Sequence, residues 1–218
     1  MLNKILNLFY SIYFNLKYMP FSIAIKFPIV ISYKTKIYHL KKGDIQIKSN
    51  NIEKFMIKIG FDGSSFVSEN NSSINIVNNG KMILGSHIKI AEGVNIFVDN
   101  GNLVMGNNIY INRNILIQCT NKISIDDDCL MGWNISLRDT SGHKVKKNGF
   151  KSSKKNEINI GKRVWIASDV TIVGDNNIKS SCIVACNSVV TNFKSSNENK
   201  LIAGIPAKEK GGDYEWEN

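Results

Sequence analysis

The chain has 218 residues, of which 43% are hydrophobic and 21% charged, and its formal net charge is +10 at pH 7. This apolar content excludes an intrinsically disordered chain, and 3 Pro with 16 Gly exclude a collagen-like one. The basic excess points to nucleic acid, an anionic membrane or an acidic substrate. It lies in two segments: residues 1–58 sum to +8 (ten basic, two acidic) and residues 144–163 sum to +7 (eight basic, one acidic), whereas the rest sums to −5.

The N-terminal stretch predicts a helix over residues 1–18, because its apolar side chains recur at helical spacing and Pro20 follows. Lys4, Lys17 and Lys26 interrupt the apolar run before it reaches the ~18 residues that span a bilayer. No small-residue cleavage site of a secretory signal follows. We expect residues 1–36 to form a helical capping segment. The helix either packs on the following domain or lies on a membrane surface.

An internal repeat fixes the architecture of the central chain. Fifteen aliphatic residues recur every sixth position within units of three: Leu84, Ile90, Ile96, Met105, Ile111, Ile117, Ile125, Met131, Leu137, Ile160, Ile166, Ile172, Ile178, Val184 and Val190. A helix repeats near 3.6 and a simple strand near 2, so a period of six indicates a triangular coil with one inward residue on each side. The competing interpretation is a β-sandwich with irregular turns.

The residues between the aliphatic positions indicate the corners of this coil. Asn and Asp are frequent there, and they tolerate the left-handed backbone conformation of sharp turns. The steps from Ile96 to Met105 and from Ile117 to Ile125 are longer than six, which predicts small bulges at corners. We expect an all-β domain over residues 37–210, a loop inserted at 138–158 and a tail at 211–218.

The four cysteines form no metal-binding or paired-cysteine motif. Cys119, Cys129, Cys182 and Cys186 show no CxxC spacing and stand among apolar residues. We therefore expect no metal site, and we expect reduced thiols in a cytoplasmic protein.

Several motifs resemble the hexapeptide-repeat acyltransferases, whose fold is a left-handed parallel β-helix. They are Ile160-Gly-Lys-Arg-Val-Trp-Ile-Ala167, Ser188-Val-Val-Thr191, Gly204-Ile-Pro-Ala-Lys208 and Arg138-Asp-Thr-Ser-Gly-His143. The resemblance covers residues 84–210 well and 37–83 loosely, and the N-terminal stretch resembles capsule and surface-polysaccharide O-acetyltransferases. It implies acetyl-CoA as the donor, a homotrimer, and active sites between neighbouring subunits.

The resemblance assigns His143 as the catalytic base. Leu137 and Ile160 are 23 residues apart where six would suffice, so about 17 residues leave the coil, and His143 lies near the start of this loop. Imidazole can accept the proton of an attacking hydroxyl at neutral pH. The competing interpretation is a solvated loop histidine. His39 and His87 belong to no such motif and are expected to be structural.

Two further residues have open roles beside His143. The indole N–H of Trp165 could donate to the thioester oxygen in the transition state, or the ring could pack beneath the loop. Asp139 could orient His143 or bind an acceptor hydroxyl, or it could cap a turn.

The resemblance also places the coenzyme contacts. They fall on Ser168, Cys186, Thr191, Asn192 and Lys208, and the lysine would meet a phosphate. The sequence departs from the family at Ala167, Cys186, Asn192 and Gly211, which leaves the phosphate contacts open.

The expected acceptor is a glycan hydroxyl of a capsule or lipooligosaccharide. The loop lysines, including Lys144 and Lys146, favour an anionic acceptor such as a sialic-acid-containing sugar, although such a run can also be only a solvated surface. The alternatives are N-acetylation of a nucleotide-linked amino sugar and a non-catalytic β-solenoid scaffold. Nucleic-acid binding is not expected, because no binding motif and no aromatic residues interleaved with these lysines are present.

Overall fold

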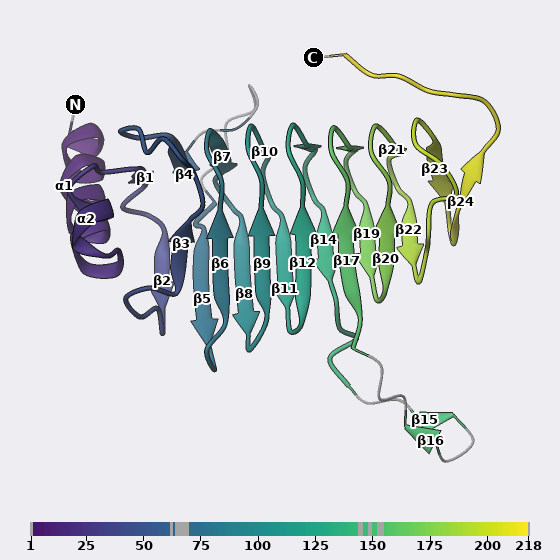
Figure 1. Ribbon diagram of the computed structural model, residues 1–218, viewed down its shortest axis with the longest axis horizontal. Coiled ribbons are helices and arrows are strands. Elements are labelled where there is room, and N and C mark those ends of the chain that lie inside the picture. Colours follow the sequence, from purple (N-terminus) through teal and green to yellow (C-terminus); the bar gives the residue numbers. More distant parts are fainter. Residues whose placement is uncertain are drawn as a thin grey trace.

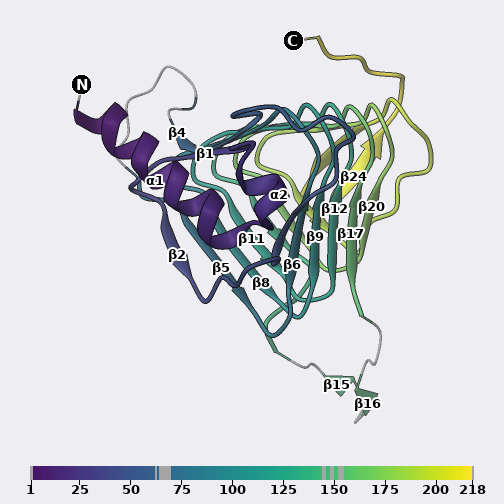
Figure 2. The same cartoon turned by 60° about the vertical axis from the view of Figure 1, so that its left-hand side comes forward.

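The computed structural model describes residues 2–61, 63, 70–143, 146–147, 150–151 and 155–217. The chain winds as a coil whose successive turns stack into three parallel sheets, each forming one face of a triangular prism (Figures 1 and 2). The expected triangular coil is therefore confirmed, and the β-sandwich is excluded.

The three faces are named here in the order in which the chain visits them. The first face contains β1 (Ile29–Ile31), β4 (Ile57–Phe61), β7 (Ile88–Ala91), β10 (Tyr110–Ile111), β13 (Leu130–Met131), β18 (Trp165–Ile166), β21 (Ile183–Val184), β23 (Leu201–Gly204) and β24 (Ala207–Lys210). The second face contains β2 (Lys36–Tyr38), β5 (Ser73–Val77), β8 (Asn95–Asp99), β11 (Leu116–Cys119), β14 (Ser136–Arg138), β19 (Thr171–Val173) and β22 (Val189–Thr191). The third face contains β3 (Ile45–Ile47), β6 (Lys81–Leu84), β9 (Asn102–Met105), β12 (Lys122–Ile125), β17 (Glu157–Ile160) and β20 (Asn176–Ile178).

The predicted inward positions form the core. All fifteen are at most 2% exposed. Strand register stacks them in columns, so that Ile111 of β10 pairs with Met131 of β13, which in turn pairs with Ile166 of β18. Each coil thus buries its apolar residues against the next coil, and stability is a sum over neighbouring coils.

Two boundaries of the coil differ from the sequence prediction. The strands begin at Ile29 rather than at residue 37, because β1 pairs with β4 in the first face. The long steps are also not bulges: the extra residues lengthen β8 and β9, and Val98 and Leu103 are buried as additional inward positions. The same lengthening occurs in β11 and β12.

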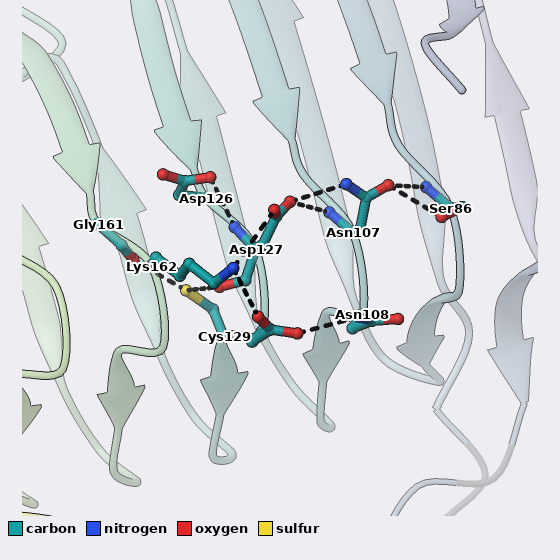
Figure 3. A network of polar contacts seen from close by, with 9 residues as sticks. Ser86, Asn107, Asn108, Asp126, Asp127, Cys129, Gly161 and Lys162 are labelled. Atoms are coloured by element: carbon teal, nitrogen blue, oxygen red, sulfur yellow. Dashed lines mark hydrogen bonds and ion pairs between the residues drawn. The ribbon is translucent and has the colours of Figure 1, made fainter. Parts of the chain in front are cut away.

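The expected left-handed corner residues are present. Asn108 and Asp128 have positive φ where the chain passes from the third to the first face (the third–first corner). Just before each of them, Asn107 and Asp127 link the coils: both the backbone N–H and the side-chain amide of Asn107 donate to Asp127, at 2.7 and 2.9 Å (Figure 3). These bonds satisfy the polar groups that a sharp turn leaves unpaired.

The N-terminal end of the prism is covered by α1 (Leu2–Tyr18), followed by α2 (Phe21–Ala24) (Figure 1). The open edge of β1 is satisfied by side chains of α1. The Asn15 amide donates to the Ile29 carbonyl at 2.7 Å, and the Ile31 N–H donates to the Ser11 hydroxyl at 2.9 Å. These residues lie one helical turn apart, so α1 pairs with the edge almost as a strand would. The expected capping helix is confirmed.

The C-terminal end closes differently. After β23 the chain turns back as β24, which pairs antiparallel with it. The tail then returns along the molecule, where Lys200 donates to Asp213 at 2.7 Å. In the part of the chain that the structure describes, no helix combines the length and the apolar character needed to cross a membrane.

Candidate active site

The expected loop leaves the prism at the corner between the second and third faces (the second–third corner). β14 ends at Arg138 and β17 begins at Glu157, and a small hairpin of β15 (Lys146–Lys147) and β16 (Phe150–Lys151) projects from this corner (Figure 2). Lys144 lies outside the described residues, and Lys146 is placed by its backbone alone. The predicted roles of both lysines in acceptor binding stay predictions.

His143 lies at the foot of this loop and is exposed to solvent. Its backbone carbonyl accepts a hydrogen bond from the Ser141 hydroxyl at 3.0 Å, and the neighbouring Gly142 has a φ of +81°. The turn therefore depends on backbone freedom that glycine provides. The imidazole is accessible to an incoming hydroxyl.

The structure shows Asp139 capping a turn, one of its expected alternatives, while its role in acceptor binding stays a prediction. Its side chain is buried, with the residue 2% exposed. The carboxylate accepts the backbone N–H groups of Thr120, Asn121 and Lys122, at distances from 2.7 to 3.0 Å, together with the Thr120 hydroxyl. This carboxylate holds the corner of the preceding coil, and its oxygens are already shared among four donors of that corner.

Trp165 faces outward from β18 and is half-buried, but not beneath the loop. It packs against Trp216 of the tail, with ring centroids 6.3 Å apart. Trp216 is fixed in turn by Arg163: its indole donates to the Arg163 carbonyl at 3.0 Å, and the guanidinium donates to the Trp216 carbonyl at 2.9 Å. The tail therefore covers the outer surface of the first face at Trp165.

His143 and Trp165 lie on different sides of the prism. His143 follows β14, on the second face, whereas Trp165 lies in β18, on the first face. The corner that carries the loop is the one that does not border the first face, as Figure 2 shows. Within one chain, the two predicted catalytic residues are not brought together.

Ser168 and Cys186 stack on one another where the chain passes from the first to the second face (the first–second corner). Trp165 pairs with Ile183, and this register places Ser168 one coil below Cys186. The Ser168 hydroxyl accepts the N–H of Trp133 at 3.2 Å, and Cys186 is exposed. Ser168 and Cys186 are thus small side chains at two consecutive levels of this corner, whereas the level before Ser168 carries Trp133.

The other predicted coenzyme residues lie across the second face from this column. Thr191 ends β22 and is exposed, and Asn192 follows it at the second–third corner, where its side-chain oxygen accepts the N–H of Asp175 at 3.1 Å. Lys208 is exposed on β24, which lies against β22. The five predicted coenzyme residues thus extend across the C-terminal end of the second face: Ser168 and Cys186 lie at the first–second corner, and Asn192 lies at the second–third corner, from which the loop of His143 also leaves.

A cavity of about 650 Å³ lies elsewhere, on the third face and the third–first corner. Ser124, Asn159 and Asn177 contribute to its lining, and it contains none of the predicted site residues. No group of His, Cys, Asp and Glu suited to a metal ion occurs among the described residues.

The fold matches that of an acetyltransferase. The chain is similar to the polySia-specific acetyltransferase NeuO, with a TM-score of 0.57, 16% identity, and coverage of 87% of this chain and 78% of that one. The predicted left-handed parallel β-helix of hexapeptide-repeat acetyltransferases is thereby confirmed as the fold. The chain therefore resembles these acetyltransferases in fold, as its repeat and motifs predicted.

Two curated proteins are similar to this chain in sequence. No protein-family model matches the chain. One is an uncharacterized 24.8 kDa protein in the cps region of Klebsiella pneumoniae, 29% identical over 92% of this chain and 86% of that protein. The other is the candidate lipopolysaccharide biosynthesis O-acetyl transferase WbbJ of Escherichia coli K12, 28% identical over 64% of this chain and 71% of that protein.

Sequence reasoning missed the aromatic lid over the first face. Trp216 stands in a short tail between acidic residues, and no repeat position marks it. No sequence signal predicted this contact, which the structure shows as the Arg163 guanidinium 5.9 Å from the Trp216 ring centroid.

Proposed function

We propose that the chain is an O-acetyltransferase that transfers the acetyl group of acetyl-CoA to a hydroxyl of a surface glycan. The observation that supports this proposal is the exposed His143, at the foot of a loop that leaves the same corner at which the predicted coenzyme residue Asn192 lies. The similarity to WbbJ, named for O-acetyl transfer in lipopolysaccharide biosynthesis, and to a cps-region protein supports a capsule or lipooligosaccharide acceptor.

In this proposal acetyl transfer is direct, within a ternary complex. His143 accepts the proton of the acceptor hydroxyl as its oxygen attacks the thioester carbonyl. The tetrahedral intermediate collapses, its carbon–sulfur bond breaks, and the imidazolium returns the proton to the departing CoA thiolate. The products are an acetyl ester and free CoA, and the enzyme is unchanged.

A donor must face the oxygen on which negative charge develops. In the proposed site this donor is either a backbone N–H of the coil or the indole N–H of Trp165. Because Trp165 and His143 lie on different sides of one chain, Trp165 can serve His143 only from a neighbouring copy. This favours a homotrimer whose sites are completed across its interfaces.

The structure favours O-acetylation over N-acetylation of a nucleotide-linked amino sugar. An amino acceptor needs a carboxylate beside the base to hold its ammonium group. Asp139, the acid nearest to His143 in the sequence, is buried and occupied by backbone N–H groups. The lysines of residues 144–155 instead suit an anionic acceptor, such as a sialic-acid-containing glycan.

We place the reaction in the cytoplasm, where acetyl-CoA is available. Cys119, Cys129 and Cys182 are buried free thiols, which suits a reducing compartment.

The test is release of CoA from acetyl-CoA by the purified protein, measured by chromatography with neutral and acidic glycans. The variant His143→Asn should lose at least ~100-fold in rate. His87→Asn is the matched control, because His87 is also exposed and lies at a distant corner, beside Glu53. Full activity in His143→Asn would disprove the mechanism, and absence of acetyl-CoA binding would favour the scaffold alternative. Activity confined to neutral glycans would contradict the anionic acceptor.

Shared sites have their own test in co-expressed variants. His143→Asn and Trp165→Ala, each weak alone, should form mixed trimers in which about a quarter of the sites join an intact His143 to an intact Trp165. Recovered activity supports a shared site. Activity that stays at the level of the separate variants contradicts it.

A further inference from the structure

The helix α1 presents polar side chains, rather than mainly apolar ones, to the edge of the coil. Its contact side with the coil carries Ser11 and Asn15, which hydrogen-bond to the edge of β1, together with Phe14 and Tyr18. Asn7 extends this side by accepting the N–H of Tyr33 at 2.9 Å. Because polar side chains satisfy the sheet edge, most apolar residues of α1 are left on its other side.

The outer side of α1 is apolar and faces away from the prism. Leu2 and Phe9 are 69% and 66% exposed, and Ile5 is 44% exposed. Positions 2, 5, 9 and 16 fall on one side of a helix with 3.6 residues per turn. The exposed large apolar residues of the N-terminal segment form what we call the end patch: Leu2, Ile5, Leu6, Leu8, Phe9, Tyr13, Leu16, Phe21 and Ile25. An apolar surface of this kind marks an interaction site.

The charge around the end patch has one sign. Residues 1–43 contain seven lysines and no Asp or Glu. Lys4 and Lys17 are exposed on α1, and Lys26 lies just after α2. The Lys17 ammonium donates to the Tyr13 hydroxyl at 2.6 Å, and this hydrogen bond raises the pKa of Lys17. A positive charge therefore stays beside the apolar side chains at physiological pH.

The position of α1 leaves its outer side unobstructed. The helix lies across the N-terminal end of the prism, whereas the tail and the projecting hairpin lie farther along its length (Figure 1). A flat surface can approach this end without meeting either of them.

We propose that the end patch binds the surface of an anionic lipid bilayer, so that the prism stands with its N-terminal end on the membrane. Apolar side chains enter the boundary between headgroups and acyl chains, and the lysines pair with lipid phosphates. A second copy of the chain suits the patch less well, because it would bring Lys4, Lys17 and Lys26 of two copies together, and the segment that carries them contains no Asp or Glu. The inference does not depend on catalysis by His143.

The first experiment uses the unmodified protein and vesicle flotation. The protein should float with vesicles of phosphatidylcholine and phosphatidylglycerol, and much less with phosphatidylcholine alone. Added salt should weaken the binding, because it screens the lysines. Equal binding to both vesicle types, or binding to neither, overturns the proposal.

Variants then assign the binding to α1. Ile5→Ser combined with Phe9→Ser should reduce partitioning by at least ~100-fold, because two large apolar side chains no longer enter the bilayer. Lys4→Gln combined with Lys17→Gln should reduce it by about 25-fold, at about fivefold for each lysine. Leu116→Ser is the matched control: Leu116 is 45% exposed, as Ile5 is 44% exposed, but lies on the second face.

Thermal unfolding checks that each variant folds, which matters most for Lys4→Gln, because position 4 falls on the same side of α1 as Asn7 and Ser11, whereas Ile5 and Phe9 lie on the outer side. Undiminished flotation of the Ile5→Ser, Phe9→Ser protein overturns the assignment. Sedimentation velocity tests whether the end patch binds a second copy of the chain instead. This is the case if the unmodified protein self-associates but does not float with vesicles, and if the double variant no longer self-associates.

Discussion

Two corners of the prism share the same left-handed backbone turn, but the side chains at the two corners have different roles. At the third–first corner, the residues before the left-handed positions are Asn107, Asp127 and Lys162, whose side chains interact from coil to coil (Figure 3). At the first–second corner the equivalent positions include Trp133, Ser168 and Cys186, of which the last two are small, and the Ser168 hydroxyl accepts the backbone N–H of Trp133. The polar side chains of the first column hold neighbouring coils together. The second column carries small side chains at its last two levels, where the coenzyme is expected to lie.

The sharpest test of this difference is to fill both columns with the same side chain. Ser168→Phe should lower kcat/KM for acetyl-CoA by at least ~100-fold, because the ring covers the surface on which the coenzyme is expected to lie. Ser180→Phe is the counterpart, since Ser180 also precedes a left-handed residue, Ser181 with a φ of +58°. Steady-state kinetics should show Ser180→Phe within about twofold of the unmodified protein. Equal losses in the two variants would abolish the distinction between the corners.

The next effect is on stability, at the corner from which the loop leaves. Asp139→Ala should lower the free energy of unfolding by about 4 kcal/mol, because three backbone N–H groups lose a buried carboxylate. Asp127→Ala should cost about 2 kcal/mol, since Asp127 is less buried and accepts from Asn107 alone among backbone groups. Urea denaturation measures both values, and an Asp139→Ala protein as stable as the unmodified one would refute the capping role.

The smallest effect concerns thiol reactivity, which compares the corners without mutation. Cys186 is exposed at the first–second corner, whereas Cys129 is buried at the third–first corner and burial raises the pKa of its thiol to about 12. Iodoacetamide should therefore label Cys186 and leave Cys129 unmodified in the folded protein. Acetyl-CoA at ten times its dissociation constant should slow labelling of Cys186 about tenfold. Mass spectrometry of peptides provides the measurement, and labelling unaffected by acetyl-CoA would remove Cys186 from the proposed coenzyme site.

The core of this fold was predictable because one physical rule repeats. Each coil must bury one aliphatic residue per face, so the sixfold period of the sequence identifies inward positions such as Ile111 and Ile172. The start of the coil was not predictable in the same way. Ile29 and Ile31 pair with β4, but they precede the regular repeat and carry no sixfold signal.

The site was predictable only where a motif and a local rule coincide. The interruption after Leu137 correctly placed the loop at a corner. The role of Asp139 depended on which backbone N–H groups lie beside it, and Thr120 to Lys122 come from the preceding coil. The contact between Trp165 and Trp216 joins residues 51 positions apart through a tail that has no periodicity. Such long-range contacts are set by tertiary packing rather than by local sequence.

The stacking of coils also sets the distance between the capped end of the prism and the loop. On the second face, β2, β5, β8, β11 and β14 are successive neighbours between the capped end and the loop. Neighbouring strands are about 4.8 Å apart, so His143 stands about 19 Å above the level of β2. Adding or removing one coil would change this height by about 4.8 Å while leaving both the cap and the loop intact. The height of the loop above the surface that α1 contacts therefore changes in fixed steps with the number of repeats.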